Sequence, residues 1–199
     1  MLALLLLLAV ASPGPLGSLP QPLPTLDRIS LAKARSGIPV VEAEQDQSGQ
    51  GGRSTGHLLM RAPPAVVWEV LTDHSRFPEF MPHLVAAQVT NRTATGERCL
   101  QTVDAVVQKV SYTLDFRWDP ATMHIDYKLA DGVPGDLKSV LGHWQLWSEA
   151  KGRATLVEYV NQVDVGTYVP GFIRGYLADS ALRDSLDAVR KRVEERASK

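Results

Sequence analysis

Alternation of apolar and polar residues through the middle of the chain is the feature that most constrains the fold. Residues 111–119 read SYTLDFRWD, in which Tyr112, Leu114, Phe116 and Trp118 alternate with polar or charged residues. A period of two residues places the apolar side chains on one face of a strand, as in a half-buried antiparallel sheet. The sequence predicts about six such strands in succession, at residues 84–91, 97–110, 111–119, 124–129, 142–147 and 155–165.

A hairpin and a short helix are expected before these strands. Residues 38–45 and 57–62 are strand-like, and the glycine-rich tract 48–56 between them suits a turn. Pro63 and Pro64 then precede AVVWEVLTD at residues 65–73, whose valines and leucine recur at helical spacing. Asp73 and the Phe77-Pro78 pair end this helix, because proline disfavours helical angles in the residue before it. The helix is therefore expected to be short, with at most one or two further turns after it.

The end of the chain predicts a long helix. Apolar residues recur at helical spacing from about residue 170 to residue 196, which predicts one amphipathic stripe. At roughly 1.5 Å per residue, this helix would be nearly 40 Å long and could lie across a whole sheet. Strands bracketed by helices indicate an α+β fold, with the helices packed on one face of a single antiparallel sheet.

The N-terminal segment has the pattern of an export signal. Residues 2–11 read LALLLLLAVA, which is too short to span a bilayer and ends in an A-x-A-like site, although no Lys or Arg precedes it. We expect residues 1–11 to be a signal peptide or a membrane anchor, which makes the protein exported, whether periplasmic, secreted or membrane-tethered. Without a functional leader, the protein would be cytoplasmic. Residues 12–36 are predicted to be a proline-rich linker or an arm against the domain at 37–199, and their removal is expected to change stability little.

Composition excludes several kinds of partner. The net charge is −1, and 22% of the residues are charged, so no basic face for nucleic acid is predicted. The single cysteine, Cys99, excludes an internal disulfide, and the five histidines lack the spacing of a metal site. No nucleophile motif or phosphate-binding loop is present, so neither a cofactor nor a metal is predicted.

The short helix and the residues after it resemble a known family. A-P-P-A-V-V-W-E-V-L-T-D at residues 62–73, followed by H-S-R-F-P-E-F-M-P-H-L, resembles the signature of the START-like superfamily. This superfamily includes polyketide cyclases and aromatases, coenzyme-Q-binding proteins and plant pathogenesis-related proteins. Gly142, Trp144 and Leu146 and the C-terminal helix also lie at matching places, so the resemblance covers about residues 38–196. It implies a helix-grip fold: a curved antiparallel sheet wrapped around the long C-terminal helix, with a hydrophobic cavity between them.

Large side chains on the expected concave face predict the lining of this cavity. The tyrosines could donate hydrogen bonds to a ligand carbonyl or could belong to the core, and Asn161 is either a cavity group or a structural contact. The proline-interrupted segment that contains Phe80 and Met81 is either a gate at the cavity mouth, where the resemblance places it, or a cap on the sheet edge. The residues predicted to line the cavity are Phe80, Met81, Tyr112, Phe116, Trp118, Ile125, Tyr127, Trp144, Tyr159, Asn161, Ile173 and Leu177.

Three functions agree with this pattern. The first is non-enzymatic binding or transport of a hydrophobic small molecule such as a lipid, an isoprenoid quinone or a polyketide. The second is a cyclase or aromatase, which needs convergent acid–base residues; Asp104 and Glu158 are the nearest candidates, and both are expected to face solvent. The third is an interaction or chaperone-like module that uses the gate as an exposed patch. The leader also suggests proximity to a membrane, and no oligomeric state follows from the sequence.

Overall fold

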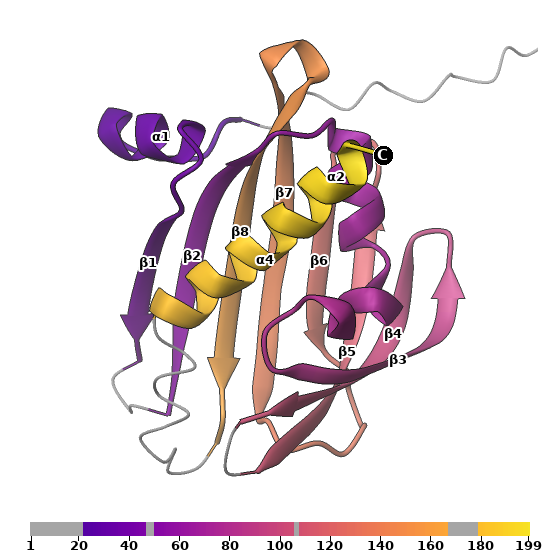
Figure 1. The fold of residues 1–199 in the computed structure, drawn as a ribbon. Coiled ribbons are helices and arrows are strands. Elements are labelled where there is room, and N and C mark those ends of the chain that lie inside the picture. Colours follow the sequence, from indigo (N-terminus) through magenta and orange to yellow (C-terminus); the bar gives the residue numbers. More distant parts are fainter. Residues whose placement is uncertain (1–21, 47–49, 106–107, 167–178) are drawn as a thin grey trace, which may run out of the picture.

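The structure is a computed structural model that describes residues 22–46, 50–105, 108–166 and 179–199. Within these residues, one antiparallel sheet has a C-terminal helix lying diagonally across one face (Figure 1). Its strands are β1 (Val40–Gln45), β2 (Gly51–Met60), β3 (Leu84–Thr93), β4 (Gly96–Asp104), β5 (Lys109–Asp119), β6 (His124–Leu129), β7 (Ser139–Glu149) and β8 (Ala154–Asp164).

The strand order is β1-β2-β8-β7-β6-β5-β4-β3, and every neighbouring pair is antiparallel. The strands from β3 to β8 follow the chain, each beside the next. The pairing of β2 with β8 then joins the first hairpin to this run. The predicted α+β helix-grip fold is confirmed.

The helices are α1 (Arg28–Arg35), α2 (Pro64–Leu71), the 3-10 turns η1 (His74–Glu79) and η2 (Ala150–Gly152), and α4 (Asp179–Ala197). Helix α2 has Pro63 at its N-cap and Pro64 in its first turn, where proline is tolerated. Helix α4 contacts β1, β2 and α2, and is the described part of the predicted C-terminal helix. Residues 167–178, which include the first turns of that prediction, lie outside the described residues.

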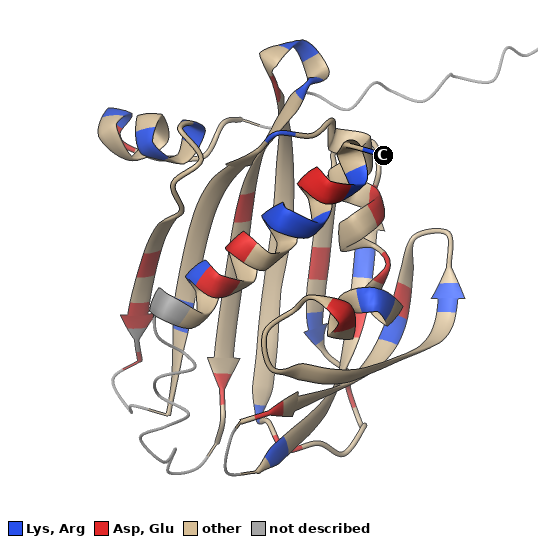
Figure 2. Ribbon diagram, in the orientation of Figure 1, with Lys and Arg blue, Asp and Glu red and all other residues tan. Residues whose placement is uncertain are grey.

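The main core lies between the sheet and the helices α2 and α4. Leu182, Leu186, Val189 and Val193 form the buried stripe of α4, as their spacing predicts. Charged residues of both signs line the rest of this helix (Figure 2). Two ion pairs connect α4 to neighbouring elements, Arg192 with Glu79 of η1 and Arg196 with Glu69 of α2.

Two strand boundaries differ most from the sequence predictions. Strand β2 begins at Gly51, inside the tract predicted as a turn, because its glycines serve close packing. A Cβ atom on Gly56 would lie 2.5 Å from Leu186 Cδ1 of α4. The predicted strand at 97–110 in fact ends at Asp104, and the Ala105 amide donates to the Gln108 carbonyl oxygen across the turn. No glycine or proline marks this reversal in the sequence.

The described part of the N-terminal arm packs on the opposite face of the sheet from α4. Ala34 of α1 is fully buried against Val40 and Leu156, whose side chains face away from the cavity. Arg35 forms an ion pair with Glu149 at 2.6 Å, and Trp147 Nε1 donates to the Pro22 carbonyl oxygen. These contacts are those of an arm against the domain, the second of the two alternatives given for residues 12–36. No helix of the described chain is long and apolar enough to cross a membrane, and the predicted leader at 1–11 lies outside the described part.

Candidate ligand cavity

A largely apolar hollow of about 190 Å³ lies between the inner face of the sheet and α4. Alternate residues of β4, β5, β7 and β8 supply its walls, because successive side chains of a strand point to opposite faces. The segment after η1 and the helix α4 supply the remaining sides. Among its described lining residues are Phe77, Met81, Val103, Leu114, Val140 and Leu182.

Most of the residues predicted from alternation do lie around this cavity. The strand pairing brings them together from distant parts of the sequence; for example, Trp144 of β7 pairs with Tyr159 of β8. Their rings stack with centroids 3.8 Å apart and almost parallel. Seven predicted residues line the cavity: Met81, Tyr112, Phe116, Tyr127, Trp144, Tyr159 and Asn161.

Three predicted lining residues lie elsewhere. Ile125 is fully buried, and Trp118 is buried with its indole nitrogen donating to the Ala94 carbonyl oxygen at 2.9 Å. Both belong to the main core cluster and do not line this cavity. Phe80 lies under the Arg192 guanidinium, 5.6 Å from its ring centroid, and does not line the cavity. Ile173 and Leu177 lie outside the described residues.

Sequence reasoning missed several lining residues on η1, β4 and β5. Phe77 is only 6% exposed and faces the cavity, where it packs with Leu84 and Val103. Gln101 lies on the inner face of β4, opposite Tyr112. Cys99, Gln101 and Val103 alternate in the sequence, which indicates that they share this face. The sequence analysis missed this because it extended the strand to residue 110.

The η1 segment is fixed to the sheet by a buried polar contact. His74 Nδ1 lies 2.6 Å from Glu97 Oε1, and both side chains are fully buried. Burial lowers the pKa of His74, against the opposing effect of Glu97, so we assign a neutral imidazole that donates to the carboxylate. The His74 ring also stacks on Phe116, with centroids 3.6 Å apart. This contact places Phe77 and Met81 of the proline-interrupted segment beside the cavity.

A cross-strand row forms the polar part of the cavity wall. Tyr127 of β6 pairs with Gly142 of β7, which pairs with Asn161 of β8. The Tyr127 ring passes over Gly142, where a Cβ atom would lie 2.5 Å from Tyr127 Cζ. The Tyr127 hydroxyl therefore reaches Asn161 Oδ1 at 2.9 Å and the Val160 carbonyl oxygen at 3.0 Å. Burial raises the pKa of Tyr127 well above its ordinary value, so the hydroxyl stays protonated at neutral pH.

The cavity offers few groups for acid–base chemistry. Apart from tyrosines, Asp136 is the only ionisable side chain among its described lining residues. Burial raises the pKa of Tyr159, and it raises the pKa of the nearby core residue Cys99 to about 12. The described residues contain no group of three or more His, Cys, Asp or Glu side chains placed to hold a metal ion. The tyrosine hydroxyls and the Asn161 amide can form hydrogen bonds with a ligand, and Asp136 is the one carboxylate among the described lining residues.

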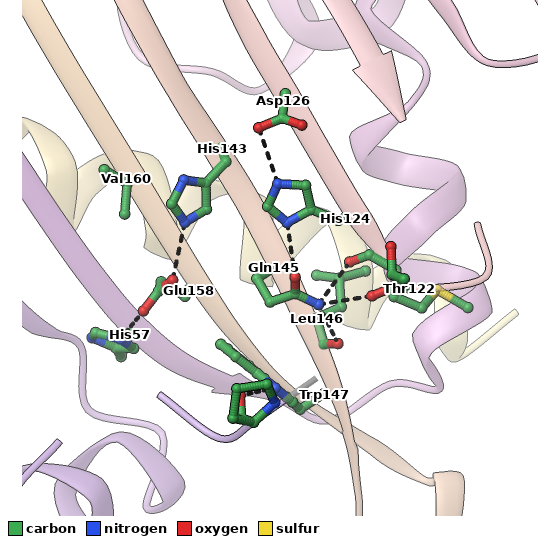
Figure 3. Close-up of polar contacts among 12 residues, drawn as sticks. His57, Thr122, His124, Asp126, His143, Gln145, Leu146, Trp147, Glu158 and Val160 are labelled. Carbon is green, nitrogen blue, oxygen red and sulfur yellow. Dashed lines mark hydrogen bonds and ion pairs between the residues drawn. The ribbon is translucent and has the colours of Figure 1, made fainter. Parts of the chain in front are cut away.

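The outer face of the sheet carries a separate polar cluster. Glu158 lies between His57 and His143, at 2.8 and 3.0 Å from their Nε2 atoms (Figure 3). The hydrogen bonds from His143 and His57 lower the pKa of Glu158 from 4.5 to about 2. Glu158 was expected to face solvent; it points away from the cavity but is half-buried between the two imidazoles.

A curved antiparallel sheet that holds an apolar cavity against a C-terminal helix defines the helix-grip class of proteins. Residues 60–190 match the family described as "Polyketide cyclase / dehydrase and lipid transport". The chain belongs to this family, and the resemblance to the START-like superfamily is confirmed. Among curated proteins, none matches the sequence.

Several solved structures share the fold. The STAR-related lipid transfer protein of Xanthomonas axonopodis is 17% identical with a TM-score of 0.65, over 78% of this chain and 93% of that one. The Zhui aromatase/cyclase of Streptomyces sp. R1128 is 16% identical with a TM-score of 0.62, over 79% and 96%. Human STARD10 is 10% identical with a TM-score of 0.62, over 78% and 69%. At these identities the likeness shows the fold alone.

Proposed function

We propose that this protein binds a hydrophobic small molecule between the sheet and α4 and carries it without changing it chemically. The observation that carries this proposal is an apolar cavity of about 190 Å³ whose described lining lacks an acid–base pair. Pockets with mostly apolar walls and a few placed polar groups are typical of ligand sites. The lipid transfer protein from Xanthomonas axonopodis supports a ligand of lipid or isoprenoid type.

A cyclase or aromatase is the second candidate, and the Streptomyces aromatase/cyclase supports it. Such an enzyme must move protons to and from its substrate. Tyr127 and Tyr159 are held protonated by burial, and Asn161 does not titrate, so these groups suit binding better than proton transfer. An interaction module is less well supported than either, because it does not require a hollow interior.

Export through residues 1–11 remains part of the proposal. An exported carrier would meet lipids and quinones of the cell envelope more often than cytosolic polyketides. Proximity to a membrane is proposed on the same ground.

Filling the cavity tests the proposal. Val163 lines the cavity and is only partly buried, so Val163→Phe should extend into the hollow with little strain. Leu141→Phe is the matched control, because Leu141 is 45% exposed on the outer face of the neighbouring β7. A neutral fluorescent probe, N-phenyl-naphthylamine, reports binding by titration, and thermal unfolding checks the fold of each variant.

Wild type and Leu141→Phe should bind the probe, whereas Val163→Phe should bind it at least about tenfold more weakly while staying folded. Failure of the wild-type protein to bind the probe, or equal binding by both variants, would refute the carrier function.

A further inference from the structure

Among the described residues, one polar group of the cavity has fewer hydrogen-bond partners than it can hold. Asn161 lines the cavity, and its Oδ1 atom accepts a hydrogen bond from the Tyr127 hydroxyl at 2.9 Å. A side-chain amide also carries two N–H donors. In the part of the chain that the structure describes, no residue accepts from Asn161 Nδ2, and this atom is not among the sealed polar atoms. The amide nitrogen is therefore free to donate to a ligand.

The orientation of this amide is set by its neighbours. Gly142 leaves room for the Tyr127 ring to cross β7, and the single hydrogen of the Tyr127 hydroxyl is shared between Asn161 Oδ1 at 2.9 Å and the Val160 carbonyl oxygen at 3.0 Å. With Oδ1 turned toward Tyr127, Nδ2 takes the other side of the amide. Tyr127 is thus a positioning residue for Asn161.

The described lining of the cavity also carries no positive charge that could balance an anion. None of its described lining residues is Lys, Arg or His, and its one carboxylate, Asp136, is exposed and accepts from the Ser111 amide. Arg92 and His74 are not lining residues, and both contact the carboxylate of Glu97. The His74 ring also stacks on Phe116, which lines the cavity. A carboxylate or phosphate that entered would lose its hydration without gaining a counter-charge.

We infer that the cavity selects neutral ligands that carry an oxygen acceptor, such as a ketone, quinone, ester or alcohol, and rejects carboxylates and phosphates. Asn161 recognises the oxygen, and the apolar walls hold the hydrocarbon body. This inference rests on the proposed carrier function and specifies its ligand class.

Three ligands with one naphthalene skeleton separate these effects: acetylnaphthalene, ethylnaphthalene and naphthoate, all substituted at the same ring position. Each competes with N-phenyl-naphthylamine for the full chain at neutral pH. The variants are Asn161→Leu, Tyr127→Phe and Gln162→Leu, where Gln162 is the exposed neighbour on the outer face of β8. Thermal unfolding confirms that each variant is folded.

In the wild-type protein, acetylnaphthalene should bind at least about tenfold more tightly than naphthoate, because only the latter is charged. Asn161→Leu should weaken acetylnaphthalene binding about three- to tenfold, as expected for one lost hydrogen bond, and leave ethylnaphthalene binding unchanged. Tyr127→Phe should reduce the same preference for the ketone, and Gln162→Leu should leave it unaltered.

The two levels of the proposal fail differently. If neither the probe nor ethylnaphthalene binds, the carrier function is wrong. If these apolar compounds bind but naphthoate binds as tightly as the ketone, the inferred selectivity is wrong. It is also wrong if Asn161→Leu, although folded, keeps the wild-type preference for the ketone over the hydrocarbon.

Discussion

Gly142 shows how one absent side chain shapes the cavity wall. The Tyr127 ring occupies the space above it, and the Val160 carbonyl oxygen lies close on the neighbouring strand. The sequence contains this glycine within the G-x-W-x-L pattern, but it does not reveal that an aromatic ring from β6 fills the place of its side chain.

Gly142→Ala should destabilise the protein by about 1–3 kcal/mol, because the new methyl group overlaps both Tyr127 and the backbone of β8. Denaturant unfolding measures this loss. In a Tyr127→Leu background, the same substitution should cost less, because part of the overlap is already removed. Equal losses in the two backgrounds would mean that Tyr127 is not the group displaced.

Glu158 should make the free energy of unfolding depend on pH in the acidic range. Its pKa is about 2 in the folded protein, below the ordinary value of 4.5. A lowered folded-state pKa contributes stability above the unfolded-state value, and this contribution disappears as the pH falls from about 4.5 to about 2. A fall in pKa of this size corresponds to roughly 3 kcal/mol, and the partial solvent exposure of Glu158 reduces this to about 2 kcal/mol.

Glu158→Gln should therefore lower the free energy of unfolding by about 2 kcal/mol near neutral pH, and the difference from wild type should shrink below about pH 4. Denaturant titrations across this pH range measure it. Glu42→Gln, at an exposed carboxylate of β1, is the control. A difference that stays constant with pH would show that the two histidines do not stabilise the carboxylate.

The alternation of apolar and polar residues predicted which face of the sheet each side chain occupies. It was less informative about which part of the structure covers that side chain. Tyr127, Trp144 and Asn161 share the inner side and line the cavity, as expected. Ile125 and Trp118 share the same side but are packed in the core. A period of two residues predicts to which face a side chain points. Whether that side chain lines the cavity or the packed core depends on which helix lies above it.

At the scale of elements, α1 shows that a proline-rich tract can end in a structural helix. Asp27 caps it, because its carboxylate accepts from the Ile29 and Ser30 amides. The composition of the segment left a linker and an arm against the domain as alternatives in the sequence analysis. Its contribution depends on one small buried residue, Ala34, which no periodic pattern identifies.

Ala34→Glu should destabilise the protein by several kcal/mol, because it forces a larger, charged side chain against Val40 and Leu156. Ile29→Glu on the same helix is the control, since Ile29 is 81% exposed. Thermal and denaturant unfolding compare them. Similar stabilities for the two variants would indicate that α1 is not docked on the sheet.

The contact between η1 and α4 suggests how the segment beside the cavity is held closed. Arg192 binds Glu79 and also covers the Phe80 ring. Phe80 thus packs between Arg192 and the Phe77 ring, while Phe77 and Met81 line the cavity.

Arg192→Gln should speed association and release of N-phenyl-naphthylamine by several-fold, because the segment beside the cavity loses one fastening to α4. Stopped-flow fluorescence measures both rates. Arg196→Gln is a close control, since Arg196 pairs with Glu69 of α2 at 2.9 Å and does not contact η1. Unchanged rates in Arg192→Gln would assign the segment a capping role only.

For the molecule as a whole, α4 covers the sheet only if its apolar stripe is intact. Leu186 is fully buried and lies directly above Gly56 of β2. The sequence predicted the described part of this helix, because Leu182, Leu186, Val189 and Val193 share its spacing. It did not predict the size of the cavity beneath, which depends on strand curvature and on glycine positions.

Leu186→Asp should abolish cooperative unfolding, because a buried carboxylate without a partner costs several kcal/mol. Lys191→Asp, at an exposed position of α4, should retain a sharp transition. Circular dichroism during heating distinguishes the two. A normal melting curve for Leu186→Asp would mean that the domain is stable without α4.

The open ends of the sheet have a consequence for behaviour at high concentration. Among the strands of the described chain, β1 and β3 each pair with one neighbour, and such edges can recruit strands from other molecules into aggregates. β1 is short and carries Glu42 and Glu44, whose like charges oppose pairing between copies. The pairing of β3 with β4 shifts register twice, and Asn91 of β3 has a φ of 51°. Irregular, charged edges of this kind give a second chain no regular ladder to extend, which protects an otherwise open sheet from aggregation.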